Sequence, residues 1–404
     1  MAITQANIHD EFMRAGRLQQ AGRIAEAIAL WRQITAAAPQ SAEAHGNLAG
    51  ALVERGDLQS AEAEARQALA LRPEAAWAHH QLGRVLHQAR RFEPAAAAYE
   101  AALALDPNDA KSRLALGHLR LQLGDLAAGW PLYEARTELA DQNARPLPWP
   151  NAWRGEPLAG GRLLIWPEQG FGDQIQFARF APVLQAIGAE VTLAAPPELT
   201  ALFAGLGVRV VSQAEPPRRD DYDFWTLPLS IPGRLRTTLG NLPAEPYLAA
   251  PAGRRARWAG YALPGTVGLA WRGRPTHPND AQRSLPAPER LLAGLEAAGA
   301  RVIDLTYPLG DFADLAAVVE QLDAVVSVDT ALAHLAGALG KRGFVLLPWL
   351  RTDWRWLEGR ADSPWYPSLR LFRQPRPGDW EPVIAEVCAA YRAEFGIESR
   401  RAGR

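Results

Sequence analysis

The sequence predicts a helical solenoid followed by two α/β domains, each built on a parallel sheet. Two observations support this fold class. Pro39, Pro73 and Pro107 stand 34 residues apart, and each closes an Ala-rich amphipathic block, which is the period of a helix–turn–helix repeat. After residue 161 the period is gone, and short apolar runs that suit buried strands alternate with helical patterns, as in doubly wound sheets.

The repeat period runs from about residue 8 to residue 143 and predicts four units that begin near residues 8, 42, 76 and 110. Small residues stand where paired first helices must approach their partners, at Ala15, Ala49, Gly83 and Gly117. This pattern resembles the tetratricopeptide repeat. We therefore expect residues 1–143 to form a short right-handed solenoid with a concave groove.

A groove of this kind binds a peptide segment or a partner helix. The candidate groove residues are polar and lie on the first helices: Asn47, His79, Gln81 and Arg113. Two alternatives remain open. These side chains could simply be solvated, and the array could serve only for dimerisation or spacing.

Composition limits the class of protein. The chain has 404 residues, of which 48% are hydrophobic, and this is enough for two or three domains with sizeable cores. A net charge of −1 gives no general attraction to nucleic acid or to an anionic membrane. No apolar run is long enough to span a membrane, and the single Cys388 suits a reducing compartment. We expect a cytoplasmic protein, and homo-oligomer formation stays open.

Residues 144–161 are expected to connect the array to the α/β part. They are rich in Pro, Trp and Gly and carry no helical period. Trp149 and Trp153 predict a connector that is docked rather than loose.

The two α/β domains are expected over residues 162–250 and 251–404. In the first domain, strands are predicted at 162–166, 189–195, 208–212 and 221–229, and helices at 174–188 and 197–207. In the second, strands are predicted at 266–271, 300–305, 324–328 and 343–347, and helices at 289–299, 312–322, 330–340 and 379–395. Because ligands bind at the carboxyl ends of such strands, the loops there should carry the chemistry.

The loop after the first strand contains Gln169, Gly170, Gly172 and Asp173. Its glycines allow close backbone approach, and a helix that begins there offers free N–H groups to an anion or a polar substrate. Asp173 could be only an N-cap. Facing a cleft, its carboxylate could instead act as a general base on an acceptor hydroxyl.

The loop at residues 272–284 is polar and holds three arginines, among them Arg272 and Arg283. Arginine suits bidentate recognition of phosphate, so we favour phosphate contact over a solvated surface loop. His277 in this loop and His334 are the two histidines of the second half, and either is a candidate acid or phosphate ligand.

The sharpest candidate site follows the predicted strand at 324–328. Asp329 and Thr330 would cap the next helix and leave its first N–H groups pointing at a phosphate. The alternative is a capped helix without a ligand. No paired Cys and no two His stand at metal-ligand spacing, so we expect no metal or other cofactor.

Residues 162–395 resemble a GT-B glycosyltransferase of the bacterial heptosyltransferase family, glycosyltransferase family 9. The motif GFGDQIQFARFAPVL resembles the family's first loop, whose Asp is the proposed base, and implies that role for Asp173. SVDTALAHLAGALG resembles the motif that binds the donor's nucleotide and diphosphate, and QRSLP resembles its basic phosphate contact. The residues so implicated are Asp329, Thr330, Ala331, His334 and Arg283. The family commonly has Gly where this chain has Ala331.

The resemblance implies an α + α/β protein in which a tetratricopeptide α-solenoid precedes a GT-B fold of two Rossmann-like domains. It further implies a bacterial, metal-independent, inverting glycosyltransferase that uses a nucleotide-sugar as substrate. The repeats would present a protein hydroxyl as acceptor. The alternatives are a scaffold whose α/β half no longer transfers sugar, and a nucleotide-sugar epimerase.

Overall fold

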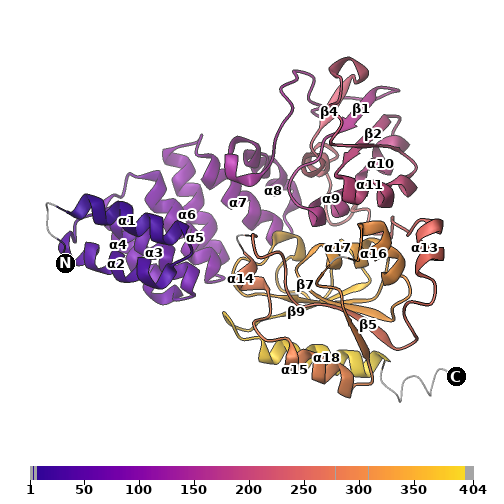
Figure 1. Cartoon of the computed structure of the whole chain (residues 1–404). Helices are drawn as coiled ribbons and strands as arrows, with labels where there is room; N and C mark the ends of the chain where they lie inside the picture. The colour runs from indigo at the N-terminus through magenta and orange to yellow at the C-terminus, as the bar shows by residue number, and fades with distance from the viewer. Residues whose placement is uncertain (1–2, 4–6, 278, 308, 396–404) are drawn as a thin grey trace. The chain divides into compact units, whose positions relative to one another are not determined.

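The structure of the protein is a computed structural model that describes residues 3, 7–277, 279–307 and 309–395. Contacts divide the chain into two compact units, and Figure 1 colours the ribbon along the sequence. Met1–Leu121 and Pro131–Glu138 form the first unit, while Gln122–Trp130 and Leu139–Arg404 form the second. Each unit has its own hydrophobic core.

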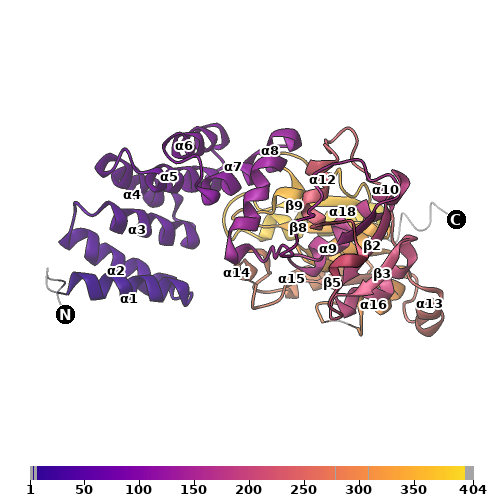
Figure 2. The ribbon, with the colours of Figure 1, turned by 90° about the horizontal axis from the view of Figure 1, so that it is seen from above.

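The first unit consists of helices in consecutive pairs, and Figure 2 shows α1 to α6 stacked one after another. The helices of the four pairs are α1 (Ile8–Gln20), α2 (Ile24–Ala37), α3 (Ala42–Arg55), α4 (Leu58–Leu71), α5 (Ala76–Gln88), α6 (Phe92–Leu105), α7 (Ala110–Gln122) and α8 (Leu126–Tyr133). The first helices of successive pairs begin 34 residues apart in the described chain. The helical solenoid predicted from the period is therefore present.

Small residues let the paired helices pack closely. A Cβ atom added to Gly83 of α5 would lie 2.7 Å from the Tyr99 ring of α6. A Cβ atom added to Gly117 of α7 would lie 2.8 Å from the backbone nitrogen of Tyr133. Contacts this short are not tolerated, so a larger residue would push the paired helices apart. Both glycines thus lie at the close helix contacts that the sequence pattern predicted.

The turn between α7 and α8 belongs to the second unit. Within that unit, Gln122 Nε2 donates to Glu358 Oε2 at 3.1 Å. Trp130 is buried, and its indole N–H donates to the Thr237 carbonyl at 2.9 Å. Two short 3-10 helices, η1 (Glu134–Glu138) and η2 (Ala140–Gln142), then lead to the connector.

The N-terminal half of the second unit is built on a parallel sheet with the strand order β3-β2-β1-β4. Its strands are β1 (Arg162–Ile165), β2 (Glu190–Ala195), β3 (Arg209–Ser212) and β4 (Phe224–Thr226). The helices that follow these strands are α9 (Phe171–Phe177), α10 (Phe180–Ala186), α11 (Pro197–Phe203) and α12 (Ile231–Arg234). The helix predicted at 174–188 is thus two helices. β4 is shorter than predicted because Pro228, which has no N–H for a strand ladder, begins the 3-10 helix η5 (Pro228–Ser230).

The connector covers one face of this sheet. Ala144, Leu147 and Trp149 pack with side chains of one sheet face, among them Leu164 and Trp225. Ala152 forms a parallel bridge with Trp225, and the Trp225 indole N–H donates to the Trp149 carbonyl at 3.1 Å. Trp153 is 2% exposed. The expectation of a docked connector is confirmed, since its tryptophans are part of the packing.

The C-terminal half is built on a second parallel sheet, in the order β6-β5-β7-β8-β9. Its strands are β5 (Thr266–Ala270), β6 (Arg301–Asp304), β7 (Ala324–Val328), β8 (Gly343–Leu347) and β9 (Leu369–Arg373). Its helices are α13 (Ala252–Trp258), α14 (Asp280–Arg283), α15 (Glu289–Ala297), α16 (Phe312–Val319), α17 (Ala331–Ala338) and α18 (Glu381–Phe395), and η6 (Trp354–Trp356) is a 3-10 turn. α15 and α18 cover one face, while α16 and α17 lie on the other (Figure 1). β9 was not predicted from the sequence.

Two parallel α/β sheets after a helical array agree with the predicted fold class, a solenoid followed by a GT-B arrangement. None of the described helices combines the length and apolar character that crossing a membrane requires.

Candidate active site

The glycine loop places Asp173 in the first turn of α9. Gly170 is the extended N-cap residue, and its N–H donates to Asp173 Oδ2 at 2.9 Å. The other carboxylate oxygen, Oδ1, accepts a hydrogen bond from Arg355 in the C-terminal half. Asp173 therefore caps its own helix and also forms an ion pair across the second unit, and its side chain remains 21% exposed.

Gln169 in the same loop has a left-handed backbone with φ 59°. Its N–H donates to the Asn143 carbonyl at 3.2 Å, and Asn143 is also left-handed with φ 49°. A non-glycine residue held in a sparsely populated conformation costs on the order of 1–3 kcal/mol, and such residues gather at binding sites. The loop and the start of the connector are thus fixed against each other.

Gly172 brings α9 against α17. A Cβ atom added to Gly172 would lie 2.7 Å from His334 Cδ2 and 3.6 Å from the Cα atom of Ala331. Because the His334 ring is buried and cannot move aside, only glycine allows this approach. Asp173 directly follows Gly172, the residue that contacts the first turn of α17. The family resemblance puts the donor at this turn.

The residues after β7 form the donor side of the candidate site. Thr330 is the extended N-cap residue of α17 and its side chain does not cap the helix; its hydroxyl lies 3.0 Å from Ser327 Oγ. Arg283 Nη1 donates to the Asp329 carbonyl at 2.8 Å. Burial, followed by the negative charge of Asp353, raises the pKa of Asp329 to about 6. An arginine and a helix N-terminus thus meet beside a carboxyl group that resists ionisation.

The polar loop after β5 divides between the site and the surface. His277 is near Arg283 and Asp173, and its pKa is lowered by burial and then by the Arg283 charge. Arg272 instead lies over the ring of Trp271 at 4.8 Å and bonds to the Tyr307 hydroxyl. Pro278 lies outside the described residues. Of the predicted arginine contacts, only Arg283 is placed beside α17.

His334 is a buried neutral imidazole. Burial, with the charge of Arg355 as the next cause, lowers its pKa to about 3. Its Nδ1 atom lies 3.1 Å from the Tyr366 hydroxyl, and its ring stacks on Trp356 at 5.2 Å. At neutral pH it can contribute a hydrogen bond but not a positive charge.

The segment after β8 also contributes to the site, although it was not predicted from the sequence. Arg355 is 4% exposed and donates to both carboxylate oxygens of Asp353, at 2.9 and 2.8 Å, as well as to Asp173. The guanidinium lies over the rings of Trp354 at 4.6 Å and Phe177 at 5.5 Å. These rings hold the arginine in place, so Arg355 fixes the orientation of the Asp173 carboxylate.

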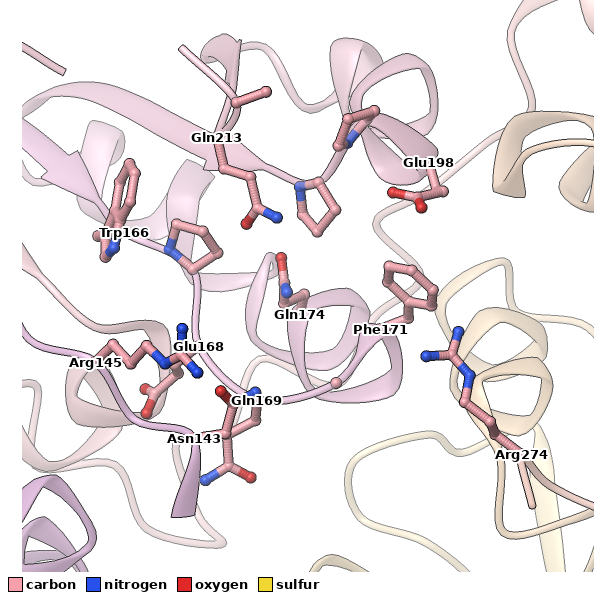
Figure 3. Close-up of a pocket in the computed structure, with 15 residues that line it drawn as sticks. Asn143, Arg145, Trp166, Glu168, Gln169, Phe171, Gln174, Glu198, Gln213 and Arg274 are labelled. Carbon is pink, nitrogen blue, oxygen red and sulfur yellow. The ribbon is translucent and has the colours of Figure 1, made fainter. Parts of the chain in front are cut away.

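A cavity of about 520 Å³ opens next to the glycine loop at the carboxyl ends of β1, β2 and β3 (Figure 3). Its walls come from the connector, the loops after those three strands and the loop after β5. The lining residues include Asn143, Arg145, Trp166, Gln169, Gly170, Phe171, Gln174, Glu198, Gln213 and Arg274. Gln169 and Gly170 therefore face a cavity.

The four candidate groove residues lie in the first unit, away from this site in the sequence. Gln81 Nε2 donates to the Gly46 carbonyl at 3.1 Å, and a ring nitrogen of His79 lies 2.9 Å from the Pro73 carbonyl. Arg113 forms a two-point ion pair with Glu138, and Asn47 is half-buried. A role of these residues in peptide binding stays a prediction.

The described residues bring Asp173, His277, Arg283, Asp329 and His334 into one region, as expected from the sequence, and add Arg355. They contain no group of three His, Cys, Asp or Glu side chains arranged to hold a metal ion. The region offers a positioned carboxylate, an arginine and a helix N-terminus. Together these suit deprotonation of a hydroxyl and stabilisation of an anionic leaving group.

Comparison with known proteins agrees with both parts of the chain. Profiles of the tetratricopeptide repeat match residues 12–76 and 76–109. A profile of glycosyltransferase family 9 (heptosyltransferase) matches residues 280–346, the stretch that holds Arg283, Asp329 and His334.

Protein FlbA of Caulobacter vibrioides is similar to this chain, with 29% identity over 323 residues. The match covers 67% of this chain and 53% of that protein, so the chain spans about half the length of this curated relative. Among solved structures, PilF of Pseudomonas aeruginosa is 24% identical and covers 34% of this chain and 63% of its own, with a TM-score of 0.31. The tetratricopeptide domain of Arabidopsis OM64 is 20% identical and covers 28% of this chain and 95% of its own, with a TM-score of 0.27.

The chain therefore combines tetratricopeptide repeats at its N-terminus with a glycosyltransferase family 9 (heptosyltransferase) domain in its C-terminal part.

Proposed function

We propose that the second unit transfers a sugar from a nucleotide-sugar to a hydroxyl group of a protein acceptor, with inversion and without a metal ion. The observation that carries the proposal is the position of Asp173. Its carboxylate is held by the Gly170 N–H and by Arg355, one residue from the contact between Gly172 and the first turn of α17. A general base has to lie between the acceptor hydroxyl and the bound donor, within hydrogen-bond reach of the proton that it removes.

In this mechanism Asp173 removes the proton from the acceptor hydroxyl as that oxygen attacks the anomeric carbon. The bond between this carbon and the diphosphate breaks, and the negative charge passes to the diphosphate. Arg283 and the first N–H groups of α17 stabilise that charge.

Arg355 acts here as a positioning residue. Its ion pair fixes one carboxylate oxygen of Asp173, and the Gly170 N–H fixes the other. The carboxylate thus keeps one orientation while its side chain stays partly exposed. Preorganised groups of this kind avoid the cost of reorganisation during the reaction.

The repeats supply the protein acceptor in this proposal, because tetratricopeptide arrays are built to hold peptide segments in their groove. Intact-mass analysis of proteins that co-purify with the chain, from cells with and without the gene, tests this assignment without assuming the donor. A mass increase by one sugar unit that depends on the gene is the expected result. An unchanged set of masses would count against a protein acceptor.

Asp173→Asn tests the base. The amide keeps the shape of the side chain but accepts no proton, so transfer should fall about 10²–10⁴-fold, whereas calorimetry should show nucleoside diphosphate binding close to wild type. Asp362→Asn is the matched control, since this Asp is 66% exposed and pairs only with nearby Arg360 among the contacts described. Full transfer by Asp173→Asn would refute the base. A wild-type protein that binds no nucleoside diphosphate at millimolar concentration would instead favour a scaffold.

A further inference from the structure

The connector builds one wall of the cavity beside Asp173. Asn143 and Arg145 line the cavity together with residues from the loops after β1, β2 and β3. Figure 3 shows the Arg145 side chain on one side of the opening and Glu198 on the opposite side, with Gln174 between the walls. All of these residues belong to the second unit, so the cavity is complete within it.

The wall is rigid. Ala144, between the two lining residues, is buried in the cluster that covers the sheet face. The Gln169 N–H holds the Asn143 carbonyl, and both residues are fixed in left-handed conformations. Asn143 and Arg145 themselves are exposed. Such a wall is preformed, which lowers the entropy cost of binding.

The lining favours a neutral polar chain. Asn143, Gln169, Gln174 and Gln213 bring four amide groups, each of which can both donate and accept hydrogen bonds. Successive peptide units present the same alternation of N–H and C=O groups. Trp166 and Phe171, with three prolines, add apolar surface for side chains.

The charges of the lining favour an occupant without net charge. The two carboxylates, Glu168 and Glu198, are matched in number by the two arginines, Arg145 and Arg274. Glu198, on the side opposite Arg145 in Figure 3, would repel a phosphate at that end of the cavity. At about 520 Å³ the volume lies within the range of roughly 300–1,000 Å³ typical of sites for small ligands, which suits a few residues of peptide.

The cavity also leads to the proposed base. Gly170 and Phe171 line it, and the Gly170 N–H is the group that holds the Asp173 carboxylate. A chain bound there passes the first turn of α9. In sequence, the wall residue Asn143 directly follows η2, at the end of the repeat part.

We propose that this cavity binds the acceptor as a short peptide segment with neutral polar side chains, and that Asn143 and Arg145 of the connector select it. The inference rests on the proposed function and deepens it. The connector is then part of the acceptor site and not only a link between the repeats and the transferase domain.

The test uses the full chain and a library of Ser- and Thr-containing neutral hexapeptides that carry a photo-reactive diazirine. After illumination, mass spectrometry maps cross-links to the loops at residues 166–171, 196–198 and 213–214. The double variant Asn143→Gly, Arg145→Ala removes both side chains while glycine keeps the left-handed backbone. We expect at least tenfold fewer cross-links in these loops, and an unchanged melting temperature.

Arg218→Ala is the matched control, since Arg218 is exposed in the same half and does not line the cavity. Equal cross-linking by the double variant and the wild type, or no cross-links to these loops in the wild type, would overturn the inference. So would binding of diazirine-labelled disaccharides at these loops in place of the peptides. Nucleoside diphosphate binding, measured on the same proteins, reports on the proposed function separately.

Discussion

The two sheets of the second unit are completed in different ways. The C-terminal sheet is covered on both faces by helices of its own α/β alternation, with α15 and α18 on one face and α16 and α17 on the other. The N-terminal sheet has helices that follow its strands, but its other face is covered by the connector, through Ala144, Leu147 and Trp149. A segment that sequence patterns classify as a linker can thus cover one face of a sheet in place of helices.

The loops at the carboxyl ends differ as well. In the N-terminal half they enclose an open cavity lined by amides and aromatic rings. In the C-terminal half they are filled by packed ionisable groups, among them Asp329, His334 and Arg355, which are all buried. The first arrangement suits a variable polymer, and the second suits one small anionic group held in a fixed position.

The largest effect should come from the contact that joins the halves. Gly172→Ala would force a Cβ atom to within 2.7 Å of the His334 ring and push α9 away from α17. Overpacking of this kind typically costs about 1–3 kcal/mol, and a shift of the base by about 1 Å can cost roughly 10²-fold in rate. Denaturant unfolding and sugar transfer measure the two effects.

The control for this substitution is Gly205→Ala, because nothing lies within 4 Å of a Cβ atom at that position. It should keep wild-type transfer and stability. A Gly172→Ala protein with an unchanged rate would show that the halves need not be in close contact for activity.

The connector layer gives the next effect, which falls on stability alone. Trp153→Ala removes a side chain that is 2% exposed, and its indole N–H donates to the Glu156 carbonyl at 2.8 Å. Truncating a buried Trp costs about 3–5 kcal/mol, and unfolding followed by tryptophan fluorescence should show this loss. Tyr261→Ala, at a residue that is 46% exposed, should cost far less. If both substitutions cost the same, the connector is not a layer of the fold.

The buried histidine predicts a pH effect in the C-terminal half. The folded pKa of His334 is about 3, against an ordinary value of 6.5, so the unfolded chain binds more protons between these values. Stability from this group is therefore present above pH 6.5 and is lost as the pH falls. The loss of stability caused by His334→Gln should shrink as the pH falls below 6.5, by up to about tenfold in the unfolding constant per pH unit.

Asp329→Asn should show the opposite sign. The folded pKa of Asp329 is about 6, above its ordinary value of 3.8, so the wild type loses stability from this carboxyl as the pH rises from about 4 to 6. The stability of the variant relative to the wild type should therefore increase as the pH rises over that range. Denaturant curves at several pH values check both variants, and the same slope for the two would contradict the assignment.

The smallest effect concerns helix caps. In the C-terminal half, Asp311 caps α16 by accepting from the Asp314 N–H at 2.9 Å. Loss of such a cap costs about 0.5–2 kcal/mol, and Asp311→Ala also removes an ion pair with Arg254 at 2.9 Å. The substitution should therefore lower stability by at least this amount and leave transfer unchanged. In the N-terminal half the capping carboxylate is the proposed base, and Asp173→Asn should reduce transfer far more than stability. If Asp311→Ala and Asp173→Asn reduced transfer to a similar extent, the two capping carboxylates would not differ in function.

The repeated elements could be predicted because their patterns are periodic. The 34-residue spacing of the prolines and the alternation of strands and helices predicted both the solenoid and the two parallel sheets. The rule that ligands meet the carboxyl ends of parallel strands also directed attention to Asp173, Arg283 and Asp329. The structure brings these three residues into one region.

The remaining features have no periodic signal. The connector residues pack on the sheet through single tryptophans and an irregular backbone. Edge strand β9 is only five residues long, and Arg370 and Arg373 interrupt its apolar residues without a regular alternation. Asp353 and Arg355 lie in the irregular segment after β8. Their position after a strand end, among Trp349, Trp354 and Trp356, was the one available signal for a site.

The boundary between the units has a consequence for recombining domains. Gln122–Trp130 belongs to the second unit, Pro131–Glu138 returns to the first, and the chain then enters the second unit again at Leu139. A single cut therefore cannot separate the repeats from the α/β part without moving a piece of one unit into the other. When a repeat array is exchanged between related proteins, the fourth helix pair and the connector would have to stay with the second unit, so the natural crossover point lies upstream of Ala110, where the third pair ends.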